Sequence, residues 1–102
     1  MQEENLSSLI IVKFYSTLRH ITKCDSMELR ITGEISLFDL FNTLNDKIFK
    51  PKEYTILGKS NKDLVPGLLC LVDGMDYKLW EETEKKIQEI KEITLISSLH
   101  GG

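Results

Sequence analysis

The sequence of 102 residues has little of what marks membrane, nucleic-acid-binding or disulfide-rich proteins. No apolar run approaches the roughly 20 residues of a membrane-spanning helix, so no membrane partner is expected. The net charge of −3 supplies no basic surface, so direct nucleic-acid binding is not expected either. Cys24 and Cys70 form no CxxC pair, and this cysteine usage does not indicate an oxidising compartment.

The start of the chain and its motifs narrow the function further. Met1–Asn5 is acidic, whereas a secretory signal begins with positive charge, so a cytoplasmic location is expected, with the nucleus as the alternative. No GxxxxGK[ST] phosphate loop and no clustered metal-ligand spacing occurs. His20 and Cys24 lie in a polar connection, and their spacing is expected to be incidental. We therefore expect no bound metal or cofactor and no catalytic activity in the chain itself.

The residues that are present, 41% of them hydrophobic and 28% charged, suit one folded domain. Aromatic and β-branched residues predict a first strand over Leu9–Tyr15. Alternating apolar and charged residues predict a second strand over Ser26–Ile31, and a polar hairpin connection joins the two. Leu68–Val72 predicts an apolar strand, and Asp73–Gly74 predicts a tight turn to a short partner strand at Tyr77–Trp80.

The remaining segments predict one main helix and one last strand. Ser36 is a plausible helix N-cap, and Pro51 ends the helical pattern. The apolar stripe of this helix is Leu37, Leu40, Phe41, Leu44 and Ile48. Ile93 and Leu95 supply the last strand, after a heavily charged Glu81–Lys91 segment with room for a helical turn. Within Lys50–Pro66, either a short strand or a turn of helix is open at residues 54–57.

This order, β-β-α-β-β-β, predicts an α+β fold in which a mixed sheet of four to five strands packs on one main helix. The apolar first and last strands are expected at the centre and the alternating second strand at a flank. The layout resembles the ubiquitin-like β-grasp fold. Residues 1–102 are expected to form one such domain, with a flexible C-terminal tail at 98–102.

Two stretches carry a more specific resemblance. Pro66-Gly67 precedes an apolar strand, Asp76-Tyr77 follows the hairpin turn, and the chain ends in Leu99-His100-Gly101-Gly102. Together they resemble the ubiquitin-related modifier family. The sequence departs from the family pattern at Val65, usually basic, at Tyr77, usually tryptophan, and at Ser16–Arg19, usually a glycine-rich turn. These departures affect partner surfaces more than the chemistry of the tail.

The terminal glycine pair has a physical rationale of its own. Glycine lacks a Cβ, so Gly101 and Gly102 can extend through a channel too narrow for other residues. The α-carboxyl group is ionised at neutral pH and can attack an activated phosphate. Leu99 and His100 are then expected to be contacts for the activating enzyme, a role that suits His100 better than general-base catalysis.

What the resemblance implies is a sulfur carrier that is also a protein modifier. A ubiquitin-activating-like enzyme with a rhodanese domain would use ATP to adenylate the Gly102 carboxylate, and sulfur would then convert it to a thiocarboxylate. A tRNA thiolation complex would use that sulfur for 2-thiouridine at the wobble position. The same activated end would form isopeptide bonds with lysines of target proteins.

Three alternatives stay open. The first is a modifier that acts mainly by conjugation, which requires the same tail. The second is a small sulfur-carrier subunit for molybdopterin or thiamine-thiazole synthesis, whose members also end in Gly-Gly but usually lack the Leu-His step. The third is a non-reactive β-grasp binding module, because a fold alone does not determine function.

The strand at residues 68–72 also predicts a candidate docking face. Leu69 and Leu71 point opposite to Leu68, Cys70 and Val72, and one set must face away from the helix. With no second helix to cover it, that face is expected to dock the activating enzyme. Cys70 is expected to be a small buried hydrophobe.

Overall fold

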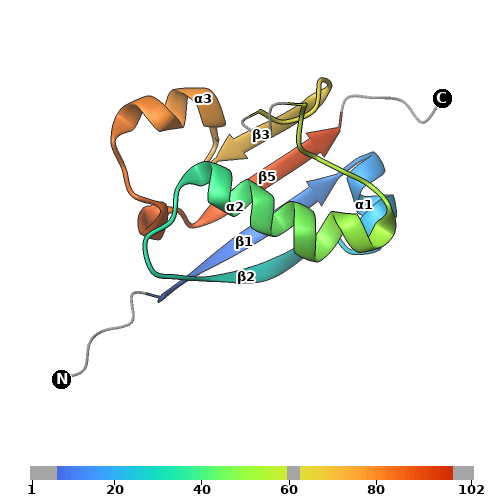
Figure 1. The fold of residues 1–102 in the computed structure, drawn as a ribbon, viewed down its shortest axis with the longest axis horizontal. Coiled ribbons are helices and arrows are strands. Elements are labelled where there is room, and N and C mark those ends of the chain that lie inside the picture. The colour runs from blue at the N-terminus through green and yellow to red at the C-terminus, as the bar shows by residue number, and fades with distance from the viewer. Residues whose placement is uncertain (1–6, 60–62, 98–102) are drawn as a thin grey trace.

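The computed structural model describes residues 7–59 and 63–97. Figure 1 shows one sheet with the longest helix lying across one of its faces. The elements are β1 (Ser7–Tyr15), α1 (Thr17–Thr22), β2 (Ser26–Thr32), α2 (Leu37–Leu44), the π-helical segment η1 (Asn45–Phe49), the short 3-10 segments η2 (Lys50–Lys52), η3 (Glu81–Thr83) and η4 (Ile87–Glu89), β3 (Leu68–Val72), β4 (Met75–Asp76), α3 (Tyr77–Trp80) and β5 (Glu92–Ser97).

The sheet has five strands in the order β2-β1-β5-β3-β4. The two outer strand pairs and the β3–β5 pair are antiparallel, whereas β1 and β5 run parallel, so the sheet is mixed as predicted. The apolar strands β1 and β5 lie inside it and the alternating strand β2 lies at one edge, which confirms the expected arrangement. The end of β5 therefore lies between β1 and β3.

The start of α2 follows from its first four residues. The Ser36 hydroxyl accepts a hydrogen bond from the Asp39 backbone N–H at 3.0 Å, and the Asp39 carboxylate accepts one from the Ser36 N–H at 3.1 Å. This reciprocal pair satisfies two backbone donors that the first turn would otherwise leave unpaired. Ser36 is thus the helix N-cap, as the sequence predicts.

The end of this helix differs from the prediction. Leu37, Leu40, Phe41 and Leu44 are buried as expected, but the next buried hydrophobic residue is Phe49, whereas Ile48 is only partly buried. The α-helix changes to a π-helix at η1, which adds one residue to the turn and replaces an i+4 step by an i+5 step. Phe49 therefore packs edge-on against Phe14 of β1, with ring centroids 5.9 Å apart.

Two further expectations about local structure were wrong. The connection between β1 and β2 contains the short helix α1, because Leu18 is completely buried and anchors it. Tyr77–Trp80 forms α3 rather than a strand. A helical turn places both Tyr77 and Trp80 in the core, whereas residues three apart in a strand would point to opposite faces.

The irregular segment after α2 is held by one buried amide. The side-chain oxygen of Asn45 accepts hydrogen bonds from the Ile56 N–H at 2.8 Å and from the Thr55 hydroxyl at 3.1 Å. Ile56 is thereby fixed in the core, and Leu57 forms an isolated antiparallel bridge with Leu64. Of the two possibilities open for residues 54–57, the structure gives an extended segment with this single bridge.

Candidate functional site at the end of the central strand

The predicted reactive residues, Leu99, His100, Gly101 and Gly102, lie outside the described residues, as does the predicted tail at 98–102. The last described residue is Ser97, which ends β5 and is buried. What the structure does define is the surface from which residues 98–102 continue. An enzyme that acts on Gly102 must come close to this end of the sheet, because five extended residues reach at most about 18 Å.

Three apolar side chains surround the end of β5 on one face of the sheet. Ile96 is paired with Tyr15 of β1 on one side and with Leu69 of β3 on the other. Residues paired in register point to the same face, so the three side chains form a row across the sheet. Tyr15 is 42% exposed and Leu69 50% exposed, and Ile96 lies between them partly buried. We call Tyr15, Ile96 and Leu69 the apolar row.

The rest of β3 settles which of its faces is covered. Leu68, Cys70 and Val72 are buried in the core, on the face of the sheet that α2 covers, whereas Leu69 and Leu71 point to the open face, where Leu71 is partly buried. The uncovered set is therefore Leu69 and Leu71, and its use in docking stays a prediction.

The open face includes more apolar residues than Leu69 and Leu71. Leu9 and Ile11 of β1 are also exposed there, in addition to Tyr15. The alternation of β1 contains the signal, because Ile10, Val12 and Phe14 point into the core and the residues between them must point away. A strand apolar on both faces is usually covered on both. Here the second face is open.

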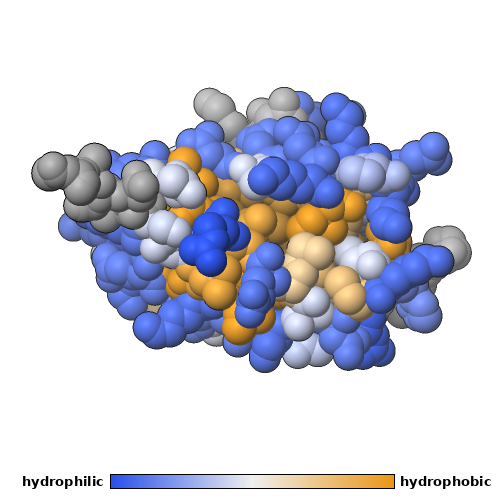
Figure 2. All heavy atoms as spheres, turned by 90° about the horizontal axis from the view of Figure 1, so that it is seen from below, coloured by the Kyte–Doolittle hydropathy of each residue, from blue (hydrophilic) through white to orange (hydrophobic). Residues whose placement is uncertain are grey.

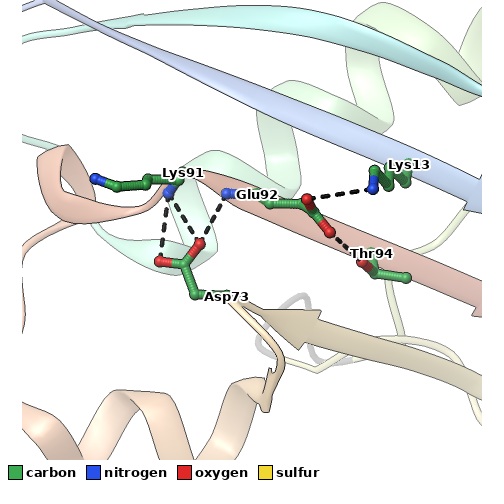
Figure 3. A network of polar contacts seen from close by, with 5 residues as sticks. All are labelled: Lys13, Asp73, Lys91, Glu92 and Thr94. Carbon is green, nitrogen blue, oxygen red and sulfur yellow. Dashed lines mark hydrogen bonds and ion pairs between the residues drawn. The ribbon is translucent and has the colours of Figure 1, made fainter.

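Polar contacts connect β1 and β5 on the same face of the sheet (Figure 3). The Lys13 ammonium group lies 3.4 Å from a carboxylate oxygen of Glu92, and the Thr94 hydroxyl donates to the other oxygen at 3.3 Å. Lys13 is on β1, and Glu92 and Thr94 are on β5. The cation and the carboxylate are about equally exposed, so this pair adds little to stability. It places one charged pair next to the apolar row.

The turn between β3 and β4 is attached to the start of β5 (Figure 3). Asp73 and Gly74 both have positive φ angles, of 52° and 85°, as a two-residue hairpin turn requires, which confirms the predicted turn. The Asp73 carboxylate accepts hydrogen bonds from the backbone N–H groups of Lys91, at 3.0 Å, and Glu92, at 2.9 Å. This contact fixes the beginning of the strand whose other end leads to residues 98–102.

A pocket of about 230 Å³ adjoins the apolar row and is lined by Lys13, Phe14, Tyr15, Arg19, Asp25 and Ser26. Its two cations already have partners, because Lys13 faces Glu92 and Arg19 lies 3.6 Å from Asp25.

His20 lies in α1 and Cys24 follows that helix. Within residues 7–59 and 63–97, no three histidine, cysteine or acidic side chains gather to hold a metal ion. None of the helices described is long and apolar enough to cross a bilayer.

Cys70 is poorly suited to sulfur chemistry. Its thiol is buried in β3, and burial, with a smaller contribution from the charge of Asp76, raises its pKa to about 12. Thiolates, not thiols, are the nucleophiles, so this side chain is protonated and inert at neutral pH. Sulfur transfer therefore has no nucleophile at this position, in agreement with the expectation that Cys70 is a core residue.

Solved structures with the same architecture are ubiquitin-like proteins. Urm1 of Sulfolobus solfataricus superimposes with a TM-score of 0.60 at 19% identity, covering 85% of this chain and 97% of that one. The small archaeal modifier protein 1 from Methanosarcina acetivorans gives a TM-score of 0.65 at 24% identity, covering 94% and 98%. At these identities the likeness establishes the fold, which is the ubiquitin-like β-grasp.

Sequence comparison is more specific than the fold. The family model of Urm1 (Ubiquitin related modifier) matches residues 9–102. Ubiquitin-related modifier 1 of Schizosaccharomyces pombe is 34% identical over 82 residues, which cover 78% of this chain and 81% of that protein. Ubiquitin-related modifier 1 of Kluyveromyces lactis is 26% identical over 98 residues, covering 91% and 97%. The chain belongs to the ubiquitin-related modifier family.

Proposed function

We propose that this protein carries sulfur as a thiocarboxylate on Gly102 and delivers it for 2-thiolation of the wobble uridine in tRNA. The observation that carries the proposal is the ending Leu99-His100-Gly101-Gly102 in a chain that the family model matches up to its last residue. The same activated end serves the protein as a ubiquitin-like modifier of target lysines. The protein acts in the cytoplasm as a substrate and carrier, and its partners supply the catalysis.

The chemistry follows from the poor reactivity of a carboxylate. A carboxylate oxygen of Gly102 attacks the α-phosphorus of ATP, and pyrophosphate leaves, so that the carbonyl carbon gains AMP as a leaving group. A persulfide on the rhodanese domain of the activating enzyme then attacks this carbon and displaces AMP. A second thiol cleaves the resulting acyl disulfide, which releases the thiocarboxylate and leaves a disulfide on the enzyme side. ATP binds to the activating enzyme.

The open face supports the proposal with a surface for the activating enzyme. The apolar row crosses β5, the strand that leads to residues 98–102. An enzyme that binds residues 99–102 can therefore contact these three side chains at the same time. Burial of exposed apolar area is the general source of binding free energy, and Tyr15 and Leu69 are each at least two-fifths exposed. Leu71 extends the same surface along β3, next to the charged pair of Lys13 and Glu92.

The test is the intact mass of the protein after incubation with ATP, the activating enzyme and a sulfur donor. The expected result is a gain equal to the replacement of one oxygen by sulfur, absent without ATP and absent in a variant that lacks Gly102. The Gly102 deletion should keep its thermal midpoint, because it leaves the packed residues in place. No mass change with an active partner enzyme would contradict the proposal.

A genetic readout separates tRNA thiolation from the related biosynthetic roles. Deletion of the gene should remove 2-thiouridine from tRNA while molybdoenzymes and thiamine synthesis stay intact. Restoration by the full chain but not by the Gly102 deletion ties the effect to the terminal carboxylate. The opposite pattern, with thiouridine retained and molybdoenzymes lost, would assign the protein to molybdopterin synthesis instead.

A further inference from the structure

Strand β2 forms one edge of the sheet, and within the described residues it pairs only with β1. Its seven residues pair with β1 without a bulge and include no proline, and its two charged residues, Glu28 and Arg30, have opposite signs, so they repel only a strand that places like charges against them. Figure 2 looks onto the side of the molecule where β2 lies and shows hydrophobic side chains gathered in a band between hydrophilic ones. This edge is therefore open to another strand.

The hydrogen bonds of β1 and β2 determine which backbone groups face outward. The Phe14 N–H donates to the Asp25 carbonyl at 2.8 Å, and the register then gives alternate residues of β2 their bonds to β1. Met27, Leu29 and Ile31 thus turn their N–H and C=O groups toward β1. Ser26, Glu28, Arg30 and Thr32 turn theirs toward the free edge. A partner strand must satisfy these four residues.

The sequence of β2 is complementary to itself when it is reversed. Ser26-Met27-Glu28-Leu29-Arg30-Ile31-Thr32 has hydroxyl residues at both ends, three apolar residues at the alternate positions, and opposite charges on either side of Leu29. In an antiparallel pair of two such strands centred on Leu29, each Glu28 lies opposite an Arg30, and each Ser26 opposite a Thr32. The apolar residues Met27 and Ile31 also meet across the pair.

The outward backbone groups select the same arrangement. Opposite residues must both face outward to form a hydrogen-bonded pair, and the Glu28–Arg30 and Ser26–Thr32 pairs fulfil this. Shifting the centre to Glu28 or to Arg30 also joins outward groups, but it places two like charges directly opposite each other. Only the Leu29-centred register combines full overlap of the seven residues, outward hydrogen bonds and opposite charges.

We infer that β2 is a self-association surface, through which two copies of this chain form an antiparallel β2–β2 pair centred on Leu29. The interface has two-fold symmetry, so the same residues serve on both sides. Glu28 and Arg30 are exposed and lie outside the two ion pairs found among the described residues, so both are available for a partner. Arg30 also donates to the Ser7 hydroxyl at 3.1 Å, and its five donors allow both contacts.

The pair joins two five-stranded sheets into one ten-stranded sheet. Residues opposite each other share a face, so the two open faces become one continuous surface with two β5 ends. Those ends stay accessible, because β1 separates β5 from the β2 edge. This self-association does not depend on the sulfur chemistry, so it can be tested without an activating enzyme.

A charge-exchange series tests the register. Sedimentation velocity over a concentration range from micromolar to millimolar should show a monomer–dimer equilibrium for the native chain. Glu28→Arg and Arg30→Glu should each weaken self-association about tenfold or more, because each variant puts like charges opposite each other twice. The double variant Glu28→Arg/Arg30→Glu should restore it. An equimolar mixture of the two single variants should associate more tightly than either variant alone, because each Arg then lies opposite a Glu.

Two controls separate the interface from general effects of charge and folding. Glu81→Arg and Lys85→Glu change the net charge by the same amounts at exposed positions away from β2, and should leave dimerisation unchanged. All variants should keep the native thermal midpoint. In hydrogen exchange, the amides of Glu28 and Arg30 should gain protection at high protein concentration, whereas those of Met27 and Leu29 are protected at every concentration.

Four results would overturn the inference. One is a monomer at all concentrations. Another is a dimer whose dissociation constant is unchanged by the single charge reversals, which would place the contact elsewhere. The third is a dimer in which the Glu28 and Arg30 amides exchange as fast as in the monomer. Occupation of the β2 edge by a strand of a different protein, with no self-association, would likewise contradict it.

Discussion

The two faces of the central sheet have similar residues and opposite surroundings. Toward α2, the side chains of β1, β3 and β5 are almost fully buried and belong to one core. On the other face the same strands carry Leu9, Ile11, Tyr15 and Leu69, each at least two-fifths exposed. Apolar residues on the covered face stabilise the fold, whereas those on the open face contribute little to it. Their presence is better explained by binding, because contiguous exposed apolar surface usually marks an interaction site.

The largest difference between the faces is expected for truncation of an aromatic ring. Phe49→Ala should lower the free energy of unfolding by about 3–5 kcal/mol, because the ring is completely buried and packs against Phe14. Tyr15→Ala on the open face should lower it by less than about 1.5 kcal/mol, since the ring is already 42% exposed. Urea denaturation measures both. Equal losses would show that the open face is part of the core.

A smaller loss is expected at the buried amide that holds the segment after α2. Asn45→Ala should cost about 1–3 kcal/mol, because it removes the acceptor for the Ile56 N–H and leaves that donor buried. Asn42→Ala, one turn earlier in α2, is the matched control, because there the lost bond runs from the side chain to the Phe38 carbonyl in a more accessible position. Its cost should be clearly lower, and a cost as large as that of Asn45→Ala would assign no special role to the Asn45 contact.

A further effect is expected only in alkaline solution. The native pKa of Cys70 is about 12, above its ordinary value of 9.0, so above pH 9 the unfolded chain loses this proton while the native chain keeps it. Stability is therefore fully present below pH 9 and declines as the pH rises toward 12. Cys70→Val should reduce this decline without removing it, because burial also raises the pKa of Tyr77. Identical pH profiles for the two proteins would contradict the assignment.

The sequence predicted those parts of the fold that depend on local chemistry. The Ser36 cap, the Asp73–Gly74 turn and the Leu68–Val72 strand follow from residue types at fixed spacing, and all three are present. The central position of the first and last strands followed from their apolar composition. These elements fix the sheet that carries the candidate site.

The parts that were missed depend on tertiary packing. The π-helical turn that brings Phe49 to Phe14 has no signal in helical periodicity. Asp76 both pairs with Leu71 in β4 and caps α3 by accepting from the Lys78 N–H, so the hairpin ends after two residues instead of running through Tyr77–Trp80.

In the candidate site, too, some features follow from local sequence and others depend on tertiary packing. The sequence predicts that Leu69 and Leu71 share one face of a strand, but only the position of α2 shows that this face is the open one. Tyr15 joins them through the pairing of β1 with β5, which links residues distant in sequence. The roles of Leu99, His100, Gly101 and Gly102 stay predictions from the sequence and its family.

The most direct measurement is the rate of thiocarboxylate formation on Leu69→Asp, compared with the native chain at increasing carrier concentration. The substituted side chain is half exposed, so the thermal midpoint should change little, while the KM for the carrier should rise about tenfold or more and kcat should stay nearly constant. The control variant Lys78→Asp, exposed on α3 and with a larger change of net charge, should leave both constants unchanged. A native KM in the folded Leu69→Asp protein would contradict the claim that the open face guides the activating enzyme to the tail.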